Sequence, residues 1–157
     1  MDFVLATEEK ELDECAVLMF QSEPWVTLKF DFKRCAASIR GDYKEVYVAR
    51  VGQELAGFVV LSYYGVLRGY IQTICVKPSF RNKGIGTALL KFSEEKILKE
   101  FPNVFICVSS FNQKAKELYL RLGFEQVGVL TNHIVRGHDE YILRKQVSPF
   151  MEFISST

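Results

Sequence analysis

The feature of this sequence that most restricts its fold is a strand that ends at a proline and leads into a basic, glycine-containing loop. The apolar run 70–76 stops at Pro78, the segment 81–87 reads Arg-Asn-Lys-Gly-Ile-Gly-Thr, and helical periodicity follows. The first turn of a helix has unpaired backbone N–H groups and the positive end of the helix dipole. Glycines there let a ligand approach the backbone, and Arg81 and Lys83 add positive charge. The segment therefore predicts a site for an anion such as a pyrophosphate.

The loop by itself leaves the nature of the anion open. A Walker A loop needs Gly-x-x-x-x-Gly-Lys-Ser/Thr, which this segment does not supply. In a dinucleotide-binding loop a third glycine would stand where this chain has Leu89, and an acidic residue would follow the next strand, where Ser109 follows Val108. A nucleotide-binding domain is therefore a disfavoured alternative. A basic helix start that binds nothing is the other alternative.

The remaining sequence predicts a mixed α/β domain. The segment 12–19 has apolar residues at helical spacing. The segments 46–51 and 55–64 are rich in β-branched and aromatic residues and flank a turn, which is typical of antiparallel strands. After position 77 the succession of strand, loop, helix and strand predicts a parallel crossover. We expect a mixed α+β fold with a central mixed sheet of six to seven strands, antiparallel in its N-terminal half, and helices on both faces.

The charges of the chain nearly cancel, because 20 Lys and Arg stand against 19 Asp and Glu, a formal net charge of +1. Proteins that bind nucleic acid or membrane surfaces broadly usually carry more positive charge, so we expect neither partner. The longest apolar runs, such as 55–61, are too short to span a bilayer, and the first residues show no secretory signal pattern. We therefore expect a cytoplasmic protein.

No metal site or disulfide is expected. The four cysteines lie far apart in apolar stretches and form no Cys-x-x-Cys pair, which indicates buried thiols. The His, Asp and Glu residues of the segment 133–140 match no common ligand spacing. They indicate a polar hairpin instead.

Two motifs resemble those of the GNAT superfamily of N-acetyltransferases. The sequence Arg-x-x-Gly-x-Gly at 81–86, after Val-x-Pro at 76–78, resembles the acyl-CoA pyrophosphate loop of that family. The sequence Asn-x-x-Ala-x-x-Leu-Tyr-x-x-x-Gly-Phe at 112–124 resembles its second motif. The resemblance covers residues 3–145 and implies a single GNAT domain over residues 1–157, with a C-terminal extension over 146–157. It also implies a sheet splayed between its fourth and fifth strands.

The resemblance implies acetyl-CoA as cosubstrate, bound between the splayed strands. The main chain before the loop would bond the pantetheine amides and polarise the thioester carbonyl, through Ile74, Cys75 and Val76. The pyrophosphate would be held by the loop and the helix start, that is by Arg81, Asn82, Lys83, Gly84, Ile85, Gly86 and Thr87. From the next helix, Asn112 and Lys114 would contact the cofactor on its other side.

Tyr119 is the catalytic residue that the resemblance implies. Its spacing from Ala115, Leu118 and Leu122 by itself favours an ordinary core position. In GNAT enzymes the tyrosine at this place protonates the departing CoA thiolate. A neutral amine would attack the acetyl carbonyl directly while Tyr119 acts as general acid, so no cysteine nucleophile is needed.

The acceptor side is less specific in the sequence. Residues expected to border the acceptor are Glu23, Trp25, Tyr70, Gln72 and His133. Glu23 and His133 are also candidates for the general base, with solvated loop charges as the alternative for both. Trp25 is equally interpreted as an anchor of the second helix. An acidic acceptor pocket would draw on Glu23, Asp31, Asp139 and Glu140.

One departure from a related subfamily limits the substrate. Ribosomal-protein alanine acetyltransferases carry a Glu in the strand before the second motif, where this chain has Cys107. Their peptide substrate is therefore not carried over. We expect an acetyl-CoA-dependent N-acetyltransferase that acts on a primary amine of a small molecule or peptide. The alternatives are a non-catalytic acyl-CoA-binding module and a protein N-terminal or lysine acetyltransferase. The apolar tail after Lys145 is expected to pack on the body or on a second subunit of a homodimer.

Overall fold

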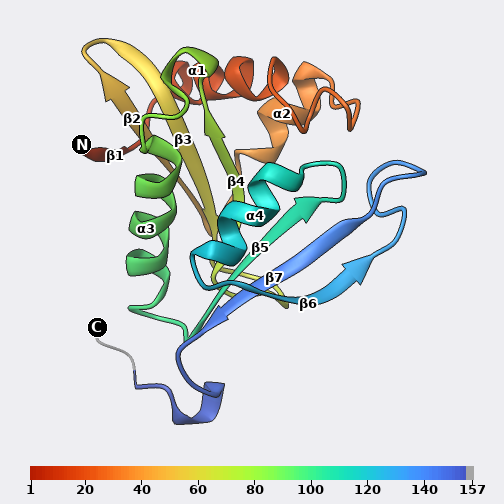
Figure 1. The fold of residues 1–157 in the computed structure, drawn as a ribbon. Coiled ribbons are helices and arrows are strands. Elements are labelled where there is room, and N and C mark those ends of the chain that lie inside the picture. The colour runs from red at the N-terminus through yellow and green to blue at the C-terminus, as the bar shows by residue number, and fades with distance from the viewer. Residues whose placement is uncertain (155–157) are drawn as a thin grey trace.

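Runs of β-branched and aromatic residues form one seven-stranded sheet in this computed structural model, which describes residues 1–154. The sheet order is β1-β2-β3-β4-β5-β7-β6 (Figure 1). The strands are β1 (Phe3–Leu5), β2 (Lys44–Val51), β3 (Glu54–Ser62), β4 (Tyr70–Val76), β5 (Asn103–Ser109), β6 (Glu125–Leu130) and β7 (Glu140–Gln146). Strands β1 to β4 pair antiparallel, β4 and β5 pair parallel, and β5, β7 and β6 pair antiparallel again. The expected mixed sheet with an antiparallel N-terminal half is confirmed.

Four helices cover the two faces of the sheet. Helices α1 (Glu9–Phe20) and α2 (Phe32–Ser38) pack on one face, with Met19, Cys35 and Phe58 in their shared core. Helices α3 (Ile85–Ile97) and α4 (Gln113–Arg121) pack on the other face, over a core that includes Leu89 and Tyr119. Because helices cover both faces of the sheet, the central strands bury apolar side chains on both faces.

The sheet splays between its fourth and fifth strands, as expected. The only Cα partners of β4 and β5 are Tyr70 with Phe105 and Ile71 with Ile106. The pairing begins where the Phe105 N–H donates to the Gly69 carbonyl at 2.9 Å. Beyond Ile71 the two strands diverge, and β4 pairs with β3 alone. The β5-facing edge of β4 therefore keeps backbone groups free for a ligand.

A β-bulge in β4 lies at Gln72. Strand β3 pairs Val60 with Thr73 and Leu61 with Ile71, so Gln72 is the extra residue. Ile71 consequently packs in the core under α3, whereas Cys75 packs in the core under α1, although four residues would normally keep them on one face. The bulge rotates the second half of β4 relative to the first.

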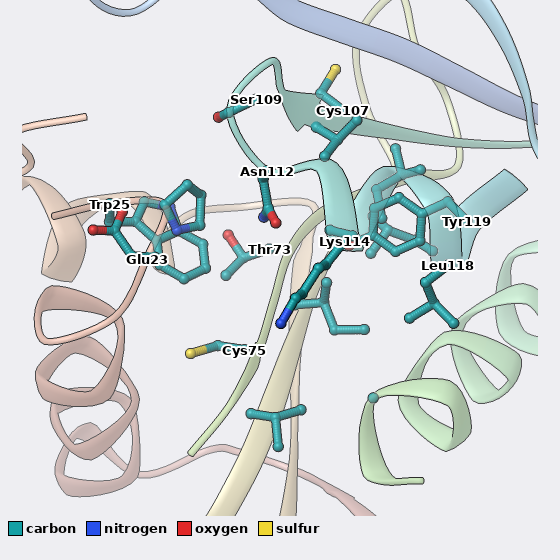
Figure 2. Close-up of a pocket in the computed structure, with 18 of the residues that line it drawn as sticks. Glu23, Trp25, Thr73, Cys75, Cys107, Ser109, Asn112, Lys114, Leu118 and Tyr119 are labelled. Carbon is teal, nitrogen blue, oxygen red and sulfur yellow. The ribbon is translucent and has the colours of Figure 1, made fainter. Parts of the chain in front are cut away.

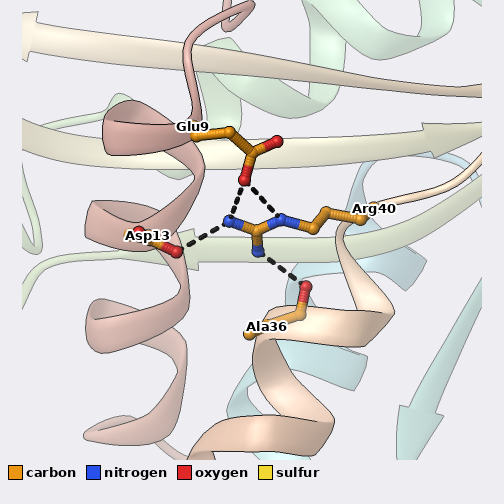
Figure 3. Close-up of polar contacts among 4 residues, drawn as sticks. All are labelled: Glu9, Asp13, Ala36 and Arg40. Carbon is orange, nitrogen blue, oxygen red and sulfur yellow. Dashed lines mark hydrogen bonds and ion pairs between the residues drawn. The ribbon is translucent and has the colours of Figure 1, made fainter.

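Arg40 joins the two helices on the α1 face (Figure 3). Its guanidinium donates to the carboxylates of Glu9 and Asp13 on α1 at 2.7 to 3.0 Å, and to the carbonyl of Ala36 in α2 at 2.8 Å. Both carboxylates are more than half exposed, so the ion pairs contribute little stability. The contact fixes how α1 and α2 sit relative to each other, and with them the loop 21–31 that joins them.

The C-terminal extension was expected to pack either on the body of the chain or on a second subunit. After β7 a short helical turn, η2 (Phe150–Glu152), leaves Phe150, Met151 and Ile154 exposed, Met151 by 93%. Packing of these three side chains on the body of the chain is therefore wrong, because the turn carries them away from the sheet, whereas Phe153, the fourth apolar residue of the segment 150–154, is partly buried. Residues 155–157 of the extension lie outside the described residues. Within residues 1–154 no helix is long and apolar enough to cross a membrane.

Candidate active site

The splay between β4 and β5 opens into a cavity of about 840 Å³. Its walls come from β4, β5, the loop that follows β4, the starts of α3 and α4, the α1–α2 loop and the β6–β7 hairpin. Figure 2 shows Glu23 and Trp25 on one side of it and Tyr119 on the other, with Asn112 and Thr73 between them. Segments far apart in the sequence therefore converge on one space.

One end of the cavity presents backbone N–H groups and a basic residue. After the short turn η1 (Pro78–Phe80), Asn82 and Gly84 adopt positive φ angles of 59° and 82°. These angles turn the chain so that α3 begins at Ile85 against the cavity, and the Ala88 N–H bonds back to the Gly84 carbonyl at 3.0 Å. The amides before Ala88 have no acceptor within the helix, so this end offers several N–H donors and a positive dipole.

The basic residues of this loop differ in where they lie. Arg81 lines the cavity, and its Nε donates to the Val76 carbonyl at 3.2 Å. Asn82, Gly84, Ile85, Gly86 and Thr87 also line it. Lys83 does not line the cavity, and its Nζ lies 5.4 Å from the centroid of the Phe80 ring. Any contact of Lys83 with an anion would therefore come from its backbone or from a moved side chain.

The middle of the cavity runs along the free edge of β4. Ile74, Cys75 and Val76 all line it, on the stretch of β4 that β5 does not reach. Opposite, Asn112 takes the N-cap position of α4 without a side-chain capping hydrogen bond, and Lys114 extends across the cavity toward β4 (Figure 2). Both α4 side chains therefore face a ligand laid along β4.

Tyr119 sits at the end of the second turn of α4 and lines the cavity while being only 6% exposed. Its ring packs 6.2 Å from that of Phe124 in the α3 core. Burial raises the pKa of its phenol, so the group stays protonated at neutral pH. Within residues 1–154 no group forms a hydrogen bond with this hydroxyl. A protonated phenol without a partner in the protein is available to a ligand in the cavity.

The predicted acceptor residues all line the cavity. Trp25 is 9% exposed in the core under α1 and also lines the cavity. Glu23 is exposed, and its Oε2 accepts from the Thr27 N–H at 3.2 Å. Gln72, the bulge residue, donates to the Ser38 carbonyl at 2.7 Å and so ties β4 to α2.

His133 and Tyr70 line the cavity from different elements. His133 is exposed on the β6–β7 hairpin. Tyr70 begins β4, and its phenol interacts with the Cys107 thiol of β5. Burial raises the pKa of this phenol well above its ordinary value.

A sequence profile decides the family. The profile of the acetyltransferase (GNAT) family matches residues 9–124, well over half of the chain and all of the loop and α4 just described. The chain belongs to the GNAT family. In this GNAT domain the two motifs therefore meet in one cavity, the first at the start of α3 and the second along α4.

Curated relatives match parts of the GNAT chain. An N-alpha-acetyltransferase of Sulfurisphaera tokodaii is 40% identical over 81 residues, which cover 50% of this chain and 48% of that relative. The chain spans about half or less of the length of the curated relatives that it matches.

Solved structures share the fold. The ribosomal-protein-S18-alanine N-acetyltransferase of Escherichia coli aligns with a TM-score of 0.75 at 19% identity, over 98% of this chain and 99% of that one. The spermidine N-acetyltransferase of Vibrio cholerae, in complex with CoA and spermine, aligns with a TM-score of 0.69 at 19% identity, over 92% of this chain and 95% of that one. At these identities the likeness concerns the fold alone.

The sequence placed Glu140 among four acidic candidates for the acceptor pocket and predicted no role for its partner Ser109. They line the cavity at 3% and 6% exposure, and the Ser109 hydroxyl donates to Glu140 Oε1 at 2.7 Å. Glu140 appeared in the sequence as one of several hairpin charges. Only the pairing of β7 with β5 distinguishes Glu140 from the other charges, because it places Glu140 opposite Ser109.

Asp139 and His138 of the hairpin do not join Glu140 in the cavity. Asp139 Oδ1 accepts from the Asn132 N–H at 3.1 Å, and the His138 ring packs 4.8 Å from that of Phe111. Asp31, another expected contributor, caps α2 by accepting from the Arg34 N–H at 2.7 Å. An acidic pocket from all four residues is therefore wrong, and Glu23 and Glu140 alone of that set line the cavity. Within residues 1–154 no three His, Cys, Asp or Glu side chains gather as a metal site.

The thiols are poor nucleophiles. All four cysteines are free. Burial raises the pKa of Cys75 to about 11 and that of Cys15 to about 12, and it also raises the pKa of Cys35 and Cys107. Because the thiolate is the reactive form, each of them stays an unreactive thiol near neutral pH.

Proposed function

We propose that this GNAT domain is an acetyl-CoA-dependent N-acetyltransferase that transfers the acetyl group directly to a primary amine. The observation that carries the proposal is the single cavity in the β4–β5 splay. It joins the free amides at the start of α3 to the buried, protonated phenol of Tyr119. An anion site, an open strand edge and a proton donor along one channel match the pyrophosphate, the amide-bearing arm and the thioester of acetyl-CoA.

The roles of the cofactor-binding residues follow from position. The start of α3 with Arg81, Asn82, Gly84, Ile85, Gly86 and Thr87 would hold the pyrophosphate, with the backbone of Lys83. The main chain of Ile74, Cys75 and Val76 would bond the pantetheine arm as a strand would. Asn112 and Lys114 would close over it from α4. Acetyl-CoA supplies the activated acetyl group.

Tyr119 is the proposed general acid. Its phenol donates a proton to the sulfur as the C–S bond breaks, and a backbone N–H of β4 supports the negative charge on the carbonyl oxygen. A single-step transfer between acetyl-CoA and amine fits the raised pKa of every thiol, since none is available to carry the acetyl group.

The acceptor is proposed to enter between the α1–α2 loop and the β6–β7 hairpin, past Glu23, Trp25 and His133, toward Tyr70 and Gln72. Two carboxylates in this half of the cavity favour a cationic amine. A protein N-terminus is the second candidate acceptor, and the 40% identity to an N-alpha-acetyltransferase over half of the chain favours it.

We also propose a cytoplasmic location and a homodimer. Four free cysteines fit a reducing compartment. The exposed Phe150, Met151 and Ile154 fit burial against a second copy. Sedimentation velocity at micromolar protein concentration tests the dimer, and a single monomeric species would contradict it.

A thermal-shift titration with acetyl-CoA, CoA, NAD and ATP tests the proposed function first. A ligand at about 100 times its Kd stabilises the fold by about 2.7 kcal/mol, which raises Tm by several degrees. We expect the shift with the two CoA species and thiol release from acetyl-CoA when an amine is added. Binding of acetyl-CoA without turnover of any amine would favour a sensing module, and a larger shift with NAD or ATP would revive a nucleotide-binding domain.

A further inference from the structure

We propose that Glu140, at the start of β7, is the general base that takes the proton from the acceptor ammonium. The inference rests on the proposed acetyl transfer and adds the group that this reaction still lacks. An alkyl ammonium has a pKa of about 10, so at neutral pH it must lose a proton before nitrogen can attack.

Glu140 is the buried carboxylate of the cavity. It is 6% exposed, whereas the other two cavity carboxylates, Glu23 and Glu117, are exposed to solvent. Glu23 is already bonded to the Thr27 amide, and Glu117 lies on α4 beside Arg121, another cavity residue of that helix. A buried ionisable side chain that lines a cavity usually has a charged or hydrogen-bonding partner or a role in function.

The carboxylate is held so that one oxygen stays available. Ser109 donates to Oε1 at 2.7 Å, and this is the hydrogen bond that the Glu140 side chain receives within residues 1–154. A carboxylate has lone pairs for several donors, so Oε2 can accept from an ammonium or from a bridging water. The pairing of Ser109 with Glu140 across β5 and β7 fixes the direction of the side chain.

The groups that face Glu140 come from three other elements. Tyr70 on β4 and Cys107 on β5 are uncharged at neutral pH, because burial raises the pKa of both. His133 on the β6–β7 hairpin interacts with Glu140 electrostatically. Burial raises the pKa of Glu140, while the Ser109 hydrogen bond and His133 oppose this rise only in part. A carboxylate with a raised pKa is a stronger base than a solvated one.

Strand β5 itself offers no carboxylate toward the cavity. Its cavity-lining residues are Ile106, Cys107, Val108 and Ser109. The neighbouring strand β7 brings Glu140 alongside, one strand farther from β4. The base is therefore supplied by the strand that pairs with β5, through the Ser109 contact.

The step balances as follows. Glu140 takes one proton from the ammonium, directly or through one water, and the neutral nitrogen forms the C–N bond as the C–S bond breaks. Tyr119 gives its proton to sulfur and recovers the second nitrogen proton as the amide forms. Glu140 then releases its proton to water. The products are the N-acetyl amide, the CoA thiol and one proton.

The test compares the pH profile of kcat/KM for wild type and Glu140→Gln. The rate is measured as thiol release from acetyl-CoA with spermidine, kanamycin or a peptide with a free N-terminal alanine as the amine. Asp139→Asn is the matched control, since it removes the adjacent charge outside the cavity and keeps an oxygen to accept from Asn132. We expect E140Q to bind acetyl-CoA like wild type, to lose about 10²- to 10⁴-fold in kcat/KM near pH 7, and to recover toward pH 10 as the amine deprotonates itself. D139N should keep the wild-type profile.

The outcomes separate the two proposals. An E140Q profile that keeps the wild-type rate and shape, in an enzyme that turns over, would overturn the role of Glu140 and leave the acetyltransferase intact. Equal losses at every pH would assign Glu140 a structural role only. Wild type that binds no acetyl-CoA, or binds it without turning over any of the three amines, would overturn the proposed function and the base with it.

Discussion

Ser109 and Glu140 face each other across the antiparallel β5–β7 pair and are joined by a hydrogen bond of 2.7 Å inside the cavity wall. Both side chains are almost fully buried. A buried carboxylate costs free energy unless a donor offsets its lost hydration, so the serine hydroxyl is part of the reason why this glutamate is tolerated there. The contact links the sheet's architecture to the acceptor end of the cavity.

Ser109→Ala should destabilise the fold by about 1 to 3 kcal/mol, because a buried acceptor loses its donor. The hydrogen bond lowers the pKa of Glu140, so its loss raises that pKa further above the ordinary value. An acid with a raised folded pKa is protonated in the folded state at low pH and costs stability as pH rises through that pKa. The S109A deficit should therefore be larger at pH 8 than at pH 5 in urea unfolding.

Ser93→Ala is the matched control for S109A. Ser93 is equally buried, but its hydroxyl donates to the Leu89 carbonyl, which carries no titratable charge. Its stability deficit should be the same at both pH values. A deficit of S109A that does not change with pH would contradict the pairing with an ionised Glu140.

Tyr119→Phe should lower kcat by about 10²- to 10⁴-fold, because the general acid is lost. Acetyl-CoA affinity and Tm should hardly change, since no residue within 1–154 bonds to the hydroxyl and the ring still packs near Phe124. Steady-state kinetics with a thermal-shift titration measure both. Tyr141→Phe, outside the cavity, serves as control, and full activity of Y119F would refute the role of the phenol.

Two glycines of the anion loop should respond in opposite ways. Gly84 has a φ of 82°, so Gly84→Ala should cost about 1 to 2 kcal/mol from backbone strain alone. Gly86 has helical geometry, and a Cβ there would meet Val76 Cγ2 at an ordinary 3.6 Å, so Gly86→Ala should leave the free protein as stable or up to about 1 kcal/mol more stable.

Gly86→Ala should weaken ligand binding although it leaves the free protein stable. A methyl group on the first turn of α3 would stand in the proposed path of the pyrophosphate, so G86A should weaken CoA binding about tenfold or more, about 1.4 kcal/mol. Isothermal titration with CoA measures this. Unchanged affinity in G86A would place the anion elsewhere.

Gly69→Ala should be the most disruptive of the glycine changes. A Cβ at Gly69 would lie 2.5 Å from the Asn103 carbonyl oxygen and 2.6 Å from Ile97 Cγ2, at a φ of 82°. Strain and overpacking together should cost about 3 kcal/mol or more in urea unfolding. Gly65→Ala has a φ of 110° with nothing within 4 Å, so it should show the smaller cost of strain alone. Equal losses of stability in the two variants would mean that the backbone at the β4–β5 junction shifts to accommodate the added methyl group.

Much of the fold could be predicted from the residues because its signals are local. The anion loop depends on Pro78 and Gly84, which act through the backbone of their own segment. The periodicity of the segment 12–19 predicts α1 without knowledge of its neighbours. The switch from antiparallel strands to a crossover follows from the order of these local elements.

Other features depend on tertiary contacts, which the sequence does not reveal. Lys83 belongs to the loop, yet its side chain lies over Phe80 and does not line the cavity. The bulge at Gln72 emerges only from the register of β3 with β4. Met151 is apolar and still exposed, because η2 leaves the body of the sheet.

The sequence by itself determined the basic, glycine-containing loop at the start of a helix and the order of strands and helices, because these signals are local. Tyr119 was singled out by its motif, since its spacing alone favours a core position. Only the tertiary structure decided which carboxylate belongs to the cavity. Glu140 lies 31 residues from Ser109 along the chain, and the pairing of β7 with β5 brings them into contact. Strand pairing joins distant residues by backbone hydrogen bonds that no local pattern records, and burial of Glu140 follows from that pairing.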